Sequence, residues 1–447
     1  MSSTITQGNT VTEVCEVMQD VLTTEANQLG RSTGLIVRQR KFNGAQFAQL
    51  LVLGWLHDAQ ASLDSLVQFG TSLNIDITAQ GLDQRFSVQA ATFLRVLVER
   101  AICHVITADP VAIPLLQRLS AVILEDSSTL SLPDELAGIF EGCGGSTQEG
   151  TMAALKLQLR LNLLNGGLQG PVLQDGRASD YASPLLEQPL PAGALHITDR
   201  GYFDLERMQQ ERAQGSYSLT YLKNGVQLFD EQGQPLDLLL LLAASSEQME
   251  RPVLAGAQQQ VPMRLLAVRV PEEIAKQRRK HLRQVARDHG RVFSHEQDLL
   301  AGWTLVLTNV PCALLSLAEA LVLLRARWQI ELLWKLWKQY GTLDEWRSKQ
   351  PWRILCELYA KLLGVLIQHW LLLLACWQEP HRSLVKAAKA VRCHAILLAY
   401  ALVGELALEF VVRKIQQVTR SGSRLNTRKT HPNTSQLLLH GLDWPLT

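Results

Sequence analysis

The sequence predicts an α/β fold in which a mixed sheet is flanked by helices. Apolar residues recur at helical spacing up to about residue 115 and again after about residue 313. Between these regions, residues 154–163 (ALKLQLRLNL) alternate strictly between apolar and polar side chains, as a strand with one wet face does. Short apolar runs separated by turn residues continue to about residue 310. The pattern therefore predicts a central sheet with helical N- and C-terminal regions.

The composition is that of a globular protein with a large core. The chain has 447 residues, of which 47% are hydrophobic and 19% are charged, and this excludes a wholly disordered protein. The net charge of +1 gives no global support for nucleic-acid binding. None of the seven cysteines forms a CxxC pair, so neither a zinc site nor a disulfide framework is indicated, and a reducing cytoplasm is expected.

No segment predicts membrane insertion. The N-terminus is polar and lacks an apolar signal core. The most apolar run, residues 362–377, is too short for a full span and contains Gln368 and His369, so it predicts a buried helix.

The N-terminal region predicts helices. Residues 46–70 have helical periodicity and end at Gly70, and Thr78 is a suitable N-cap for the next helix. Two helices around a short turn resemble a helix-turn-helix, in which Gln80, Gln84 and Arg85 would face a DNA groove. Plain helix packing explains the same pattern.

The central region predicts strands and one crossover helix. Residues 121–133 form a strand-like run, and residues 154–163 and 168–175 flank Asn-Gly-Gly turn chemistry, which predicts a hairpin. Residues 194–199 predict a strand, FDLERMQQERAQ predicts a helix and SYSLTYLKNG predicts a further strand.

Residues 226–310 predict a strand-rich insertion. The strand candidates are LDLLLLLAA, MRLLAVRV and GWTLVLTNV. The basic segment KQRRKHLRQVARDHG, residues 276–290, interrupts them and predicts a helix. Its cations form either a solvated face or a track for DNA phosphates.

Two aspartates end strand-like runs. Asp126 follows one run and Asp199 follows another, so both could lie at one edge of the sheet. Asp126 could instead be a turn residue, and Asp199 could cap the next helix. Glu125 adjoins Asp126, but strand alternation places the two side chains on opposite faces of the sheet.

A third acid lies in RWQIELLWKLWK, residues 327–338. On an ideal helix Arg327, Glu331, Trp334 and Lys338 form one stripe, beside an apolar stripe that can dock on the sheet. An Arg327–Glu331 ion pair worth a few tenths of a kcal/mol is the simple alternative. Two strand-end aspartates and a helical glutamate can instead bind two divalent metal ions, which activate water or a DNA 3′-hydroxyl for displacement at phosphorus. Oxygen ligands point to Mg²⁺.

Four ordered motifs carry a family resemblance. They are DSSTLSLP (126–133), ITDRGYFD (197–204), GWTLVLTNVP (302–311) and R-x3-E-x6-K on Arg327, Glu331 and Lys338. Over about residues 120–345 the chain resembles bacterial insertion-sequence transposases of the DDE type, specifically the insertion-sequence-four family.

The resemblance implies an RNase H-like mixed sheet with flanking helices, interrupted by a β-rich insertion. The implied regions are a helical DNA-binding region (1–115), a first part of the catalytic core (116–225), the insertion (226–312), a second part of the core (313–378), and a helical C-terminal region with a basic tail (379–447).

The resemblance also implies the chemistry. Asp126, Asp199 and Glu331 become the catalytic, metal-binding triad for Mg²⁺, with Mn²⁺ as a substitute. The implied reaction is metal-dependent cleavage at transposon ends and strand transfer into target DNA, that is, cut-and-paste transposition. A catalytically silent DNA-binding relative and an RNase H-like nuclease without strand transfer are the alternatives. The implied DNA-binding residues are Arg327, Lys338, Trp303, Lys335 and Arg200.

The implied partners are double-stranded DNA, as terminal inverted repeats and target, and a second copy of the chain in a homodimer. A bacterial cytoplasmic, nucleoid-associated location without membrane contact is expected. Trp303 could stack on a flipped base, as an aromatic does in relatives that form a DNA hairpin, or it could be a core residue. The family signature has tyrosine three residues before the arginine, whereas this chain has Leu324, which cannot donate a hydrogen bond to a phosphate of a DNA hairpin.

Overall fold

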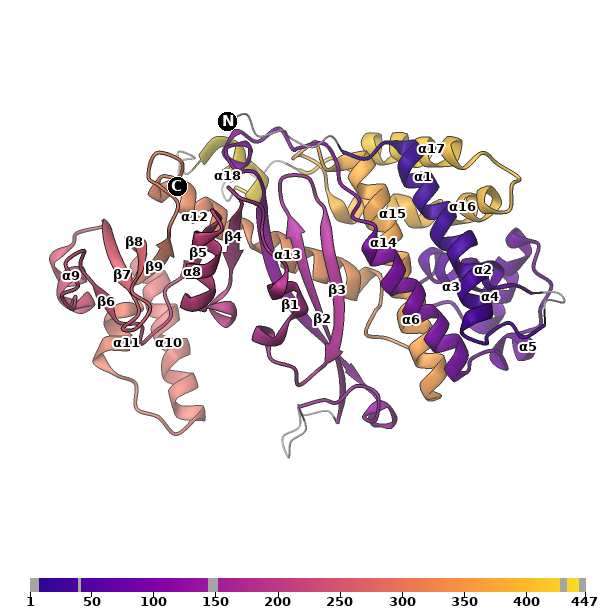
Figure 1. The fold of residues 1–447 in the computed structure, drawn as a ribbon, viewed down its shortest axis with the longest axis horizontal. Coiled ribbons are helices and arrows are strands. Elements are labelled where there is room, and N and C mark those ends of the chain that lie inside the picture. The colour runs from indigo at the N-terminus through magenta and orange to yellow at the C-terminus, as the bar shows by residue number, and fades with distance from the viewer. Residues whose placement is uncertain (1–7, 39–41, 144–151, 427–431, 442–447) are drawn as a thin grey trace. The chain divides into compact units, whose positions relative to one another are not determined.

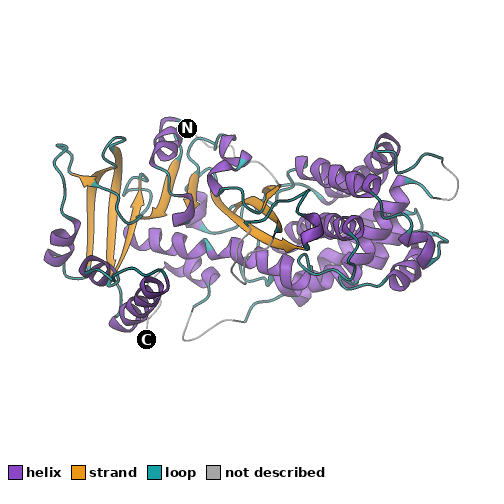
Figure 2. Ribbon diagram, turned by 90° about the horizontal axis from the view of Figure 1, so that it is seen from below, coloured by secondary structure: helices purple, strands orange, loops and turns teal. Residues whose placement is uncertain are grey.

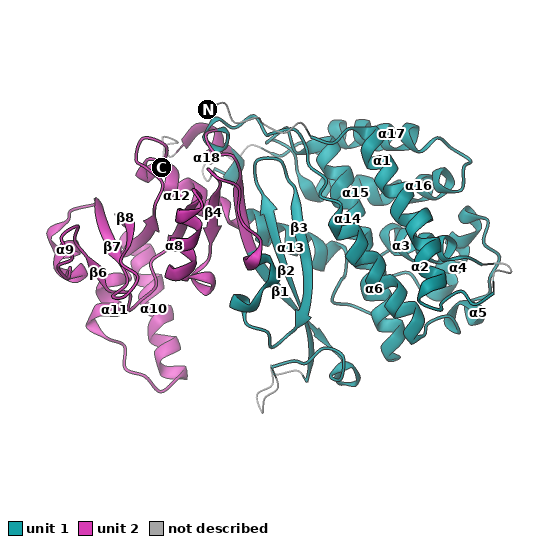
Figure 3. Cartoon of the chain, viewed as in Figure 1, with its two compact units in different colours: residues 1–117, 126–185, 329–435 teal, residues 118–125, 186–328, 436–447 magenta. Residues whose placement is uncertain are grey.

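A computed structural model describes residues 8–38, 42–143, 152–426 and 432–441 of the chain. Residues 427–431 and 442–447, which belong to the predicted basic tail, lie outside the described residues. The chain divides into two compact units (Figure 3). Unit 1 comprises residues 1–117, 126–185 and 329–435, and unit 2 comprises residues 118–125, 186–328 and 436–447.

Within the described residues, the strands have the order β3-β2-β1-β4-β5-β9-β8-β7-β6 (Figure 2). Strand β1 passes from unit 2 into unit 1; β2 and β3 belong to unit 1 and the others to unit 2. The β1–β4 and β4–β5 pairs are parallel and the β2–β3 and β5–β9 pairs are antiparallel, so the sheet is mixed. The strands are β1 (Val122–Leu132), β2 (Ala153–Asn162), β3 (Leu168–Asp175), β4 (Leu195–Thr198), β5 (Tyr217–Tyr221), β6 (Leu228–Phe229), β7 (Gln248–Ala255), β8 (Val261–Arg269) and β9 (Trp303–Thr308).

Unit 1 contains many helices, of which the long apolar helix α14 contacts α3, α6 and α17 (Figure 1). These helices are α1 (Val11–Gln19), α2 (Ala26–Ser32), α3 (Gly44–His57), α4 (Leu63–Gly70), α5 (Ala79–Asp83), α6 (Val88–Cys103), α7 (Pro114–Gln117), α13 (Trp328–Lys335), α14 (Pro351–Cys376), α15 (Leu384–Cys393), α16 (Ala395–Leu402) and α17 (Leu408–Gly422). Among the described residues, α14 alone is long and apolar enough to cross a membrane, yet 94% of its most apolar window is buried in the protein. The prediction of a buried helix is therefore confirmed.

A buried histidine ties α14 to the β2–β3 hairpin. His369 Nε2 lies 2.8 Å from the Gly166 carbonyl oxygen, and burial lowers the pKa of His369 to about 4. The ring is therefore neutral, and Nε2 donates its proton to this carbonyl. Gly166 has φ +73°, and a side chain there would collide with Leu373 and Trp377 of α14. The turn predicted from Asn-Gly-Gly is thus also a docking point for the core helix.

Unit 2 contains the parallel strands, the antiparallel β6–β9 segment and its own helices. These helices are α8 (Leu205–Ala213), α9 (Leu238–Ala244), α10 (Glu272–Asp288), α11 (His295–Leu300) and α12 (Leu317–Ala326), and α18 (Thr434–His440) ends the described chain. Asp204 caps α8 by accepting hydrogen bonds from the backbone amides of Glu206 and Arg207. The strands predicted at 121–133, 194–199 and 216–225 and the helices predicted at 203–214 and 276–290 are confirmed.

Three predicted elements differ from the structure. The strand predicted over 236–244 is instead helix α9 (Leu238–Ala244), because Asp237 caps the segment by accepting a hydrogen bond from the Leu240 amide. Periodicity cannot separate helix from strand in an unbroken leucine run. The helix predicted over 46–70 is two helices, broken where Asp58 is extended. The helix predicted after Thr78 is also two, because Ser87 starts α6.

The polar face of β2 is buried, which corrects the predicted wet face. Gln158 and Arg160 are at most 1% exposed. Gln158 donates to Gln174 of β3, and Gln174 donates to the Ala182 carbonyl in the segment that follows β3. Carbonyl groups of that segment accept hydrogen bonds from Gln174 and from Lys156, whereas the Oε1 atom of Gln158 is buried without a partner among the described residues.

Candidate active site

Strand β1 carries two adjacent carboxylates in different surroundings. The parallel pairing of β1 with β4 ends at Leu124 and Ile197. Glu125, the next residue, is completely buried in unit 2, whereas Asp126 is partly exposed in unit 1. The preference for Asp126 over Glu125 as a metal ligand therefore agrees with the two environments.

Glu125 belongs to a buried charge network in unit 2. His196 of β4 lies between two carboxylates, with Nε2 at 3.2 Å from Glu125 Oε2 and Nδ1 at 2.8 Å from Glu211 Oε1. Arg207 of α8 contacts both acids, at 3.2 Å from Glu125 Oε2 and 3.1 Å from Glu211 Oε1. The Ser218 hydroxyl of β5 donates to Glu211 at 3.0 Å. The network thus joins β1, β4, β5 and α8.

The surroundings favour the charged forms of His196 and Glu211. Burial by itself would lower the pKa of His196, but attraction to Glu211 and hydrogen bonds with Glu125 and Glu211 raise it above its usual value. Burial would likewise raise the pKa of Glu211, but His196, Arg207 and the Ser218 hydroxyl lower it. Acidic and basic side chains thus lie next to one another in the interior, as a stable buried network requires. No sequence motif had indicated this network, although the i,i+4 spacing of Arg207 and Glu211 in α8 is a weak signal.

Asp199 directly follows β4. Its Oδ1 accepts a hydrogen bond of 2.7 Å from the Arg200 amide and so starts the single 3₁₀ turn η6 (Arg200–Tyr202). The capping role considered from the sequence is therefore present, but only for this short turn. The Asp199 side chain also lines a pocket in unit 2.

This pocket of about 380 Å³ combines the acid with cations and aromatic rings. Arg200 lies over the Tyr221 ring, with Cζ 5.6 Å from the ring centre. Arg278 of α10 donates to the Trp303 carbonyl and to the Thr304 hydroxyl at 2.9 and 3.1 Å. The pocket lining is Asp199, Arg200, Tyr221, Leu222, Asn224, Arg278, His281, Leu282, Gln297, Leu300, Ala301, Trp303, Thr304 and Leu305.

Trp303 is mainly a core residue. Its side chain is 6% exposed and belongs to the apolar cluster that β7, β8 and β9 share. Arg269 lies over the ring at 5.9 Å from its centre. The core alternative considered from the sequence is therefore present, and Tyr221, which the sequence analysis did not select, is the more exposed aromatic of this pocket.

Glu331 lies on α13 in unit 1 and is partly exposed. The predicted apolar stripe of Ile330, Leu333 and Trp337 is buried, at 2% exposure or less, and so anchors the helix. Trp334 is also buried, at 6%, and packs edge-on against Trp337. The charged stripe expected on an ideal helix is therefore interrupted by a core residue.

The segment after α13 is not an ideal helix either. It continues as the π-helix η7 (Leu336–Tyr340), which changes the register at Lys338. Lys338 donates to the Thr129 carbonyl of β1 at 2.8 Å, and burial lowers its pKa. This contact links η7 to the part of β1 that carries Asp126.

The remaining predicted residues have simple placements. Lys335 is exposed on α13, and Arg200 is exposed beside Asp199. Arg327, at the end of α12 in unit 2, is partly exposed. Leu324, which occupies the position of the family tyrosine, is 3% exposed in α12.

Comparison with known proteins decides the family. The family described as "Transposase DDE domain" matches residues 118–367, more than half of the chain. The chain belongs to this family. It is a bacterial DDE-type transposase of an insertion sequence, which confirms the resemblance inferred from the four motifs.

Similar transposases match most of the chain. The transposase for insertion sequence element IS231F of Bacillus thuringiensis subsp. israelensis is 25% identical over 93% of this chain and 92% of its own length. The transposase for IS231B of Bacillus thuringiensis subsp. berliner is 26% identical over 76% of this chain and 75% of its own length. The transposase for IS1151 of Clostridium perfringens is 21% identical over 77% of this chain and 76% of its own length.

The DDE transposase domain implies an enzyme that acts on DNA and needs a divalent metal ion. Each of the three predicted acids can offer oxygen donors to such an ion. Asp126, Asp199 and Glu331 are all partly exposed, in contrast to Glu125, which buried cations hold in the interior. Carboxylate oxygens on the surface of a transposase are suitable donors for a hard divalent cation.

Proposed function

We propose that this transposase excises and inserts its element by a cut-and-paste reaction in which Asp126, Asp199 and Glu331 are the catalytic residues. The observation that carries the proposal is the position of the two aspartates. Each comes two residues after the last register pair of β1 and β4, Leu124 with Ile197. The two aspartates therefore occupy equivalent positions just beyond the paired part of two parallel strands. Both lie inside the segment that matches the DDE family.

The strand order supports an RNase H-like core. The order β3-β2-β1-β4-β5, with β1, β4 and β5 parallel and β2 antiparallel to β3, contains the hairpin and crossover that the resemblance implies. The antiparallel strands β6 to β9 follow β5 and precede α12, which agrees with a β-rich insertion over residues 226–312.

We assign Mg²⁺ to the three carboxylates, with Mn²⁺ as a substitute, because hard oxygen donors select these ions. Bound Mg²⁺ would lower the barrier for displacement at the DNA phosphorus by a water or a 3′-hydroxyl. The carboxylates would hold the ions, and within unit 2 the network of Glu125, His196, Arg207 and Glu211 joins β1, β4, β5 and α8. On this assignment each of the three acids is required for activity, so that even its amide, which has nearly the same volume, cannot replace it.

Cations of both units supply candidate DNA contacts. Arg327, Lys335, Lys338 and Arg200 are proposed to hold backbone phosphates, and Trp303 to support the wall of the pocket beside Asp199. Lys338 would have to exchange the Thr129 carbonyl for a phosphate, whereas Lys335 is already exposed.

Helix α10 offers a longer basic surface in the insertion. It lines a groove of about 500 Å³ with Glu272, Lys276, Arg279, Lys280, Arg283, Arg287 and Asp298. Arg279 and Arg283 form ion pairs with Glu272 and Asp298. Lys276, Lys280 and Arg287 are exposed and have no ion pair within the described residues, so they are the cations offered to phosphates.

The test uses the full chain, DNA with the element's terminal inverted repeat, and Mg²⁺. Glu331→Gln should abolish nicking and joining to target DNA while it keeps binding of the repeat, and Glu135→Gln, an exposed acid elsewhere in unit 1, should leave both unchanged. Full activity of Glu331→Gln would refute the triad. A two-to-two complex of chain and repeat DNA in sedimentation would support the proposed homodimer, and a one-to-one complex that still joins ends would contradict it.

A further inference from the structure

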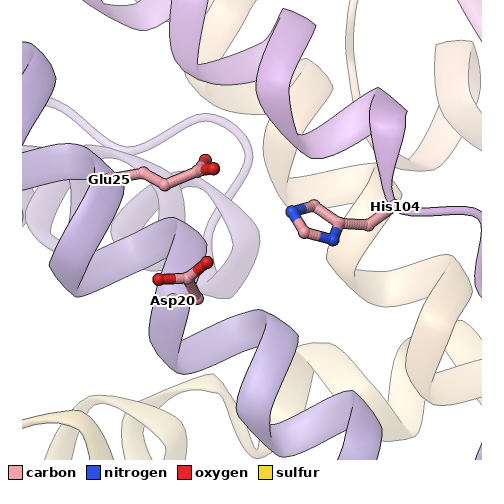
Figure 4. A group of neighbouring side chains, drawn as sticks. All are labelled: Asp20, Glu25 and His104. Carbon is pink, nitrogen blue, oxygen red and sulfur yellow. The ribbon is translucent and has the colours of Figure 1, made fainter.

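Three metal-ligating side chains of unit 1 converge outside the proposed active site (Figure 4). Asp20 and Glu25 lie at the two ends of the π-helix η1 (Asp20–Glu25), and His104 directly follows α6. Their ligand atoms all lie within 4.8 Å of one another. Figure 4 shows the Glu25 carboxylate and the His104 imidazole pointing toward each other across a gap that Asp20 borders.

The backbone explains why the two acids share a side. Residues five apart diverge on an α-helix but lie one above the other where the hydrogen bonds run from i to i+5. The π-turn is held from outside, because buried Gln49 of α3 donates to the Leu22 carbonyl at 3.1 Å and to the Thr23 hydroxyl at 3.3 Å. The geometry that brings Asp20 and Glu25 together is therefore built into the packing of η1 on α3.

A second observation points to a ligand. The Oε2 atom of Glu25 is buried and has no hydrogen-bond partner. Neither Asp20, Glu25 nor His104 forms a side-chain ion pair or hydrogen bond within the part of the chain that the structure describes. A buried carboxylate oxygen without a partner is unfavourable, and a second acid nearby increases the cost. A cation in the gap would remove both penalties.

The donor set selects the ion. One imidazole and two carboxylates suit a first-row transition metal, whereas Mg²⁺ prefers oxygen donors alone. Ligands at about 2.0–2.2 Å from Zn²⁺ lie at most about 4.4 Å apart, so small side-chain rotations would close the site. We propose that Asp20, Glu25 and His104 bind Zn²⁺, or a metal ion of that class, and thereby tie η1 to the end of α6. Three protein ligands leave room for water as a fourth.

The experiment measures metal binding without reference to transposition. The full chain carries Asp126→Asn and Glu331→Gln so that the proposed catalytic carboxylates contribute little. Zn²⁺ is titrated by calorimetry in the presence of excess Mg²⁺, and Co²⁺ is followed by its visible absorption. His104→Gln and Glu25→Gln are compared with His57→Gln and Glu16→Gln, which change exposed residues of the same types in the same unit.

We expect each chain to bind one Zn²⁺, and excess Mg²⁺ should not displace it. His104→Gln and Glu25→Gln should each weaken binding at least tenfold, and the two control variants should bind as the parent does. Without metal, Glu25→Gln should unfold at the same temperature as the parent or higher, because the substitution removes repulsion. Zn²⁺ should raise the unfolding temperature of the parent and of the two control variants, but not that of Glu25→Gln. No Zn²⁺ binding by the parent, or equal affinity in His104→Gln, would overturn the proposal. If His104→Gln proves unstable, Glu25→Gln decides alone.

Discussion

The buried charge network allows a test that compares a buried ion pair, with its further partners in the network, with an exposed ion pair of the same spacing. Arg207 and Glu211 are an i,i+4 pair on α8, with Nε 3.1 Å from Oε1 and side-chain exposures of 14% and 9%. Arg95 and Glu99 are an i,i+4 pair on α6 with the same two atoms at the same 3.1 Å, but with exposures of 52% and 49%. Each pair is truncated by Arg→Met and by Glu→Gln.

The expected costs differ because only one pair leaves a charge in the interior. Arg207→Met leaves Glu125 and Glu211 facing His196 alone, and loss of one partner in a buried network costs about 3–5 kcal/mol. Arg95→Met leaves Glu99 in water, and an exposed helical pair is worth about 0.3–0.5 kcal/mol after solvent screening. The difference is at least about 2.5 kcal/mol, which corresponds to at least roughly 70-fold in the opening equilibrium.

Native-state hydrogen exchange, resolved to peptides that cover α8 and α6, measures the local opening free energy of each helix separately. Arg207→Met should lower protection of α8 and leave α6 unchanged, and Arg95→Met should barely affect either helix. The double variants give the coupling energies, which should exceed about 1.5 kcal/mol for the buried pair only. Equal coupling energies in the two pairs would refute the argument from burial.

Three further outcomes follow from the same structure. Because the pKa of His196 is raised, its contribution to stability is complete below pH 6.5 and is lost as pH rises through the raised value. The urea midpoint of unfolding should therefore fall as pH rises through that range. His196→Gln should weaken this pH dependence. The lowered pKa of His369 has the opposite effect: its contribution to stability is present above pH 6.5 and lost as pH falls toward about 4. His369→Leu should therefore remove this loss of stability at acid pH. At pH 7 the same variant should lower the free energy of unfolding by about 1–3 kcal/mol, because it leaves the Gly166 carbonyl unpaired. Trp303→Ala should destabilise unit 2 by about 3–5 kcal/mol in urea unfolding, because the ring is core; an unchanged midpoint would show that the ring is dispensable for folding.

Sequence patterns predicted the elements that local chemistry determines. The alternation over 154–163 and the Asn-Gly-Gly turn gave the β2–β3 hairpin, and the basic segment at 276–290 gave α10. The same patterns misassigned α9, because five consecutive leucines have no period and only the Asp237 cap distinguishes the helix.

The surroundings of the candidate residues could not be predicted in the same way. The sequence placed Glu125 and Asp126 on different faces, but not the burial of Glu125 between His196 and Arg207, because those contacts join residues up to 82 positions apart. The stripe on residues 327–338 assumed an ideal helix, and the π-turn after Lys335 shifts Lys338 toward Thr129. Such register changes depend on tertiary packing, which spacing alone does not encode.

The discontinuity of unit 1 affects how the chain can fold during synthesis. Helix α3, in which all residues but Gln46 and His57 are buried, packs on α14, and α14 is complete only about 320 residues after α3 ends. At about 5–20 residues per second, a ribosome needs roughly 16–64 s to make that stretch. During that time the surface of α3 that packs on α14 has no native partner, so aggregation of the nascent transposase should increase as synthesis of this stretch is slowed.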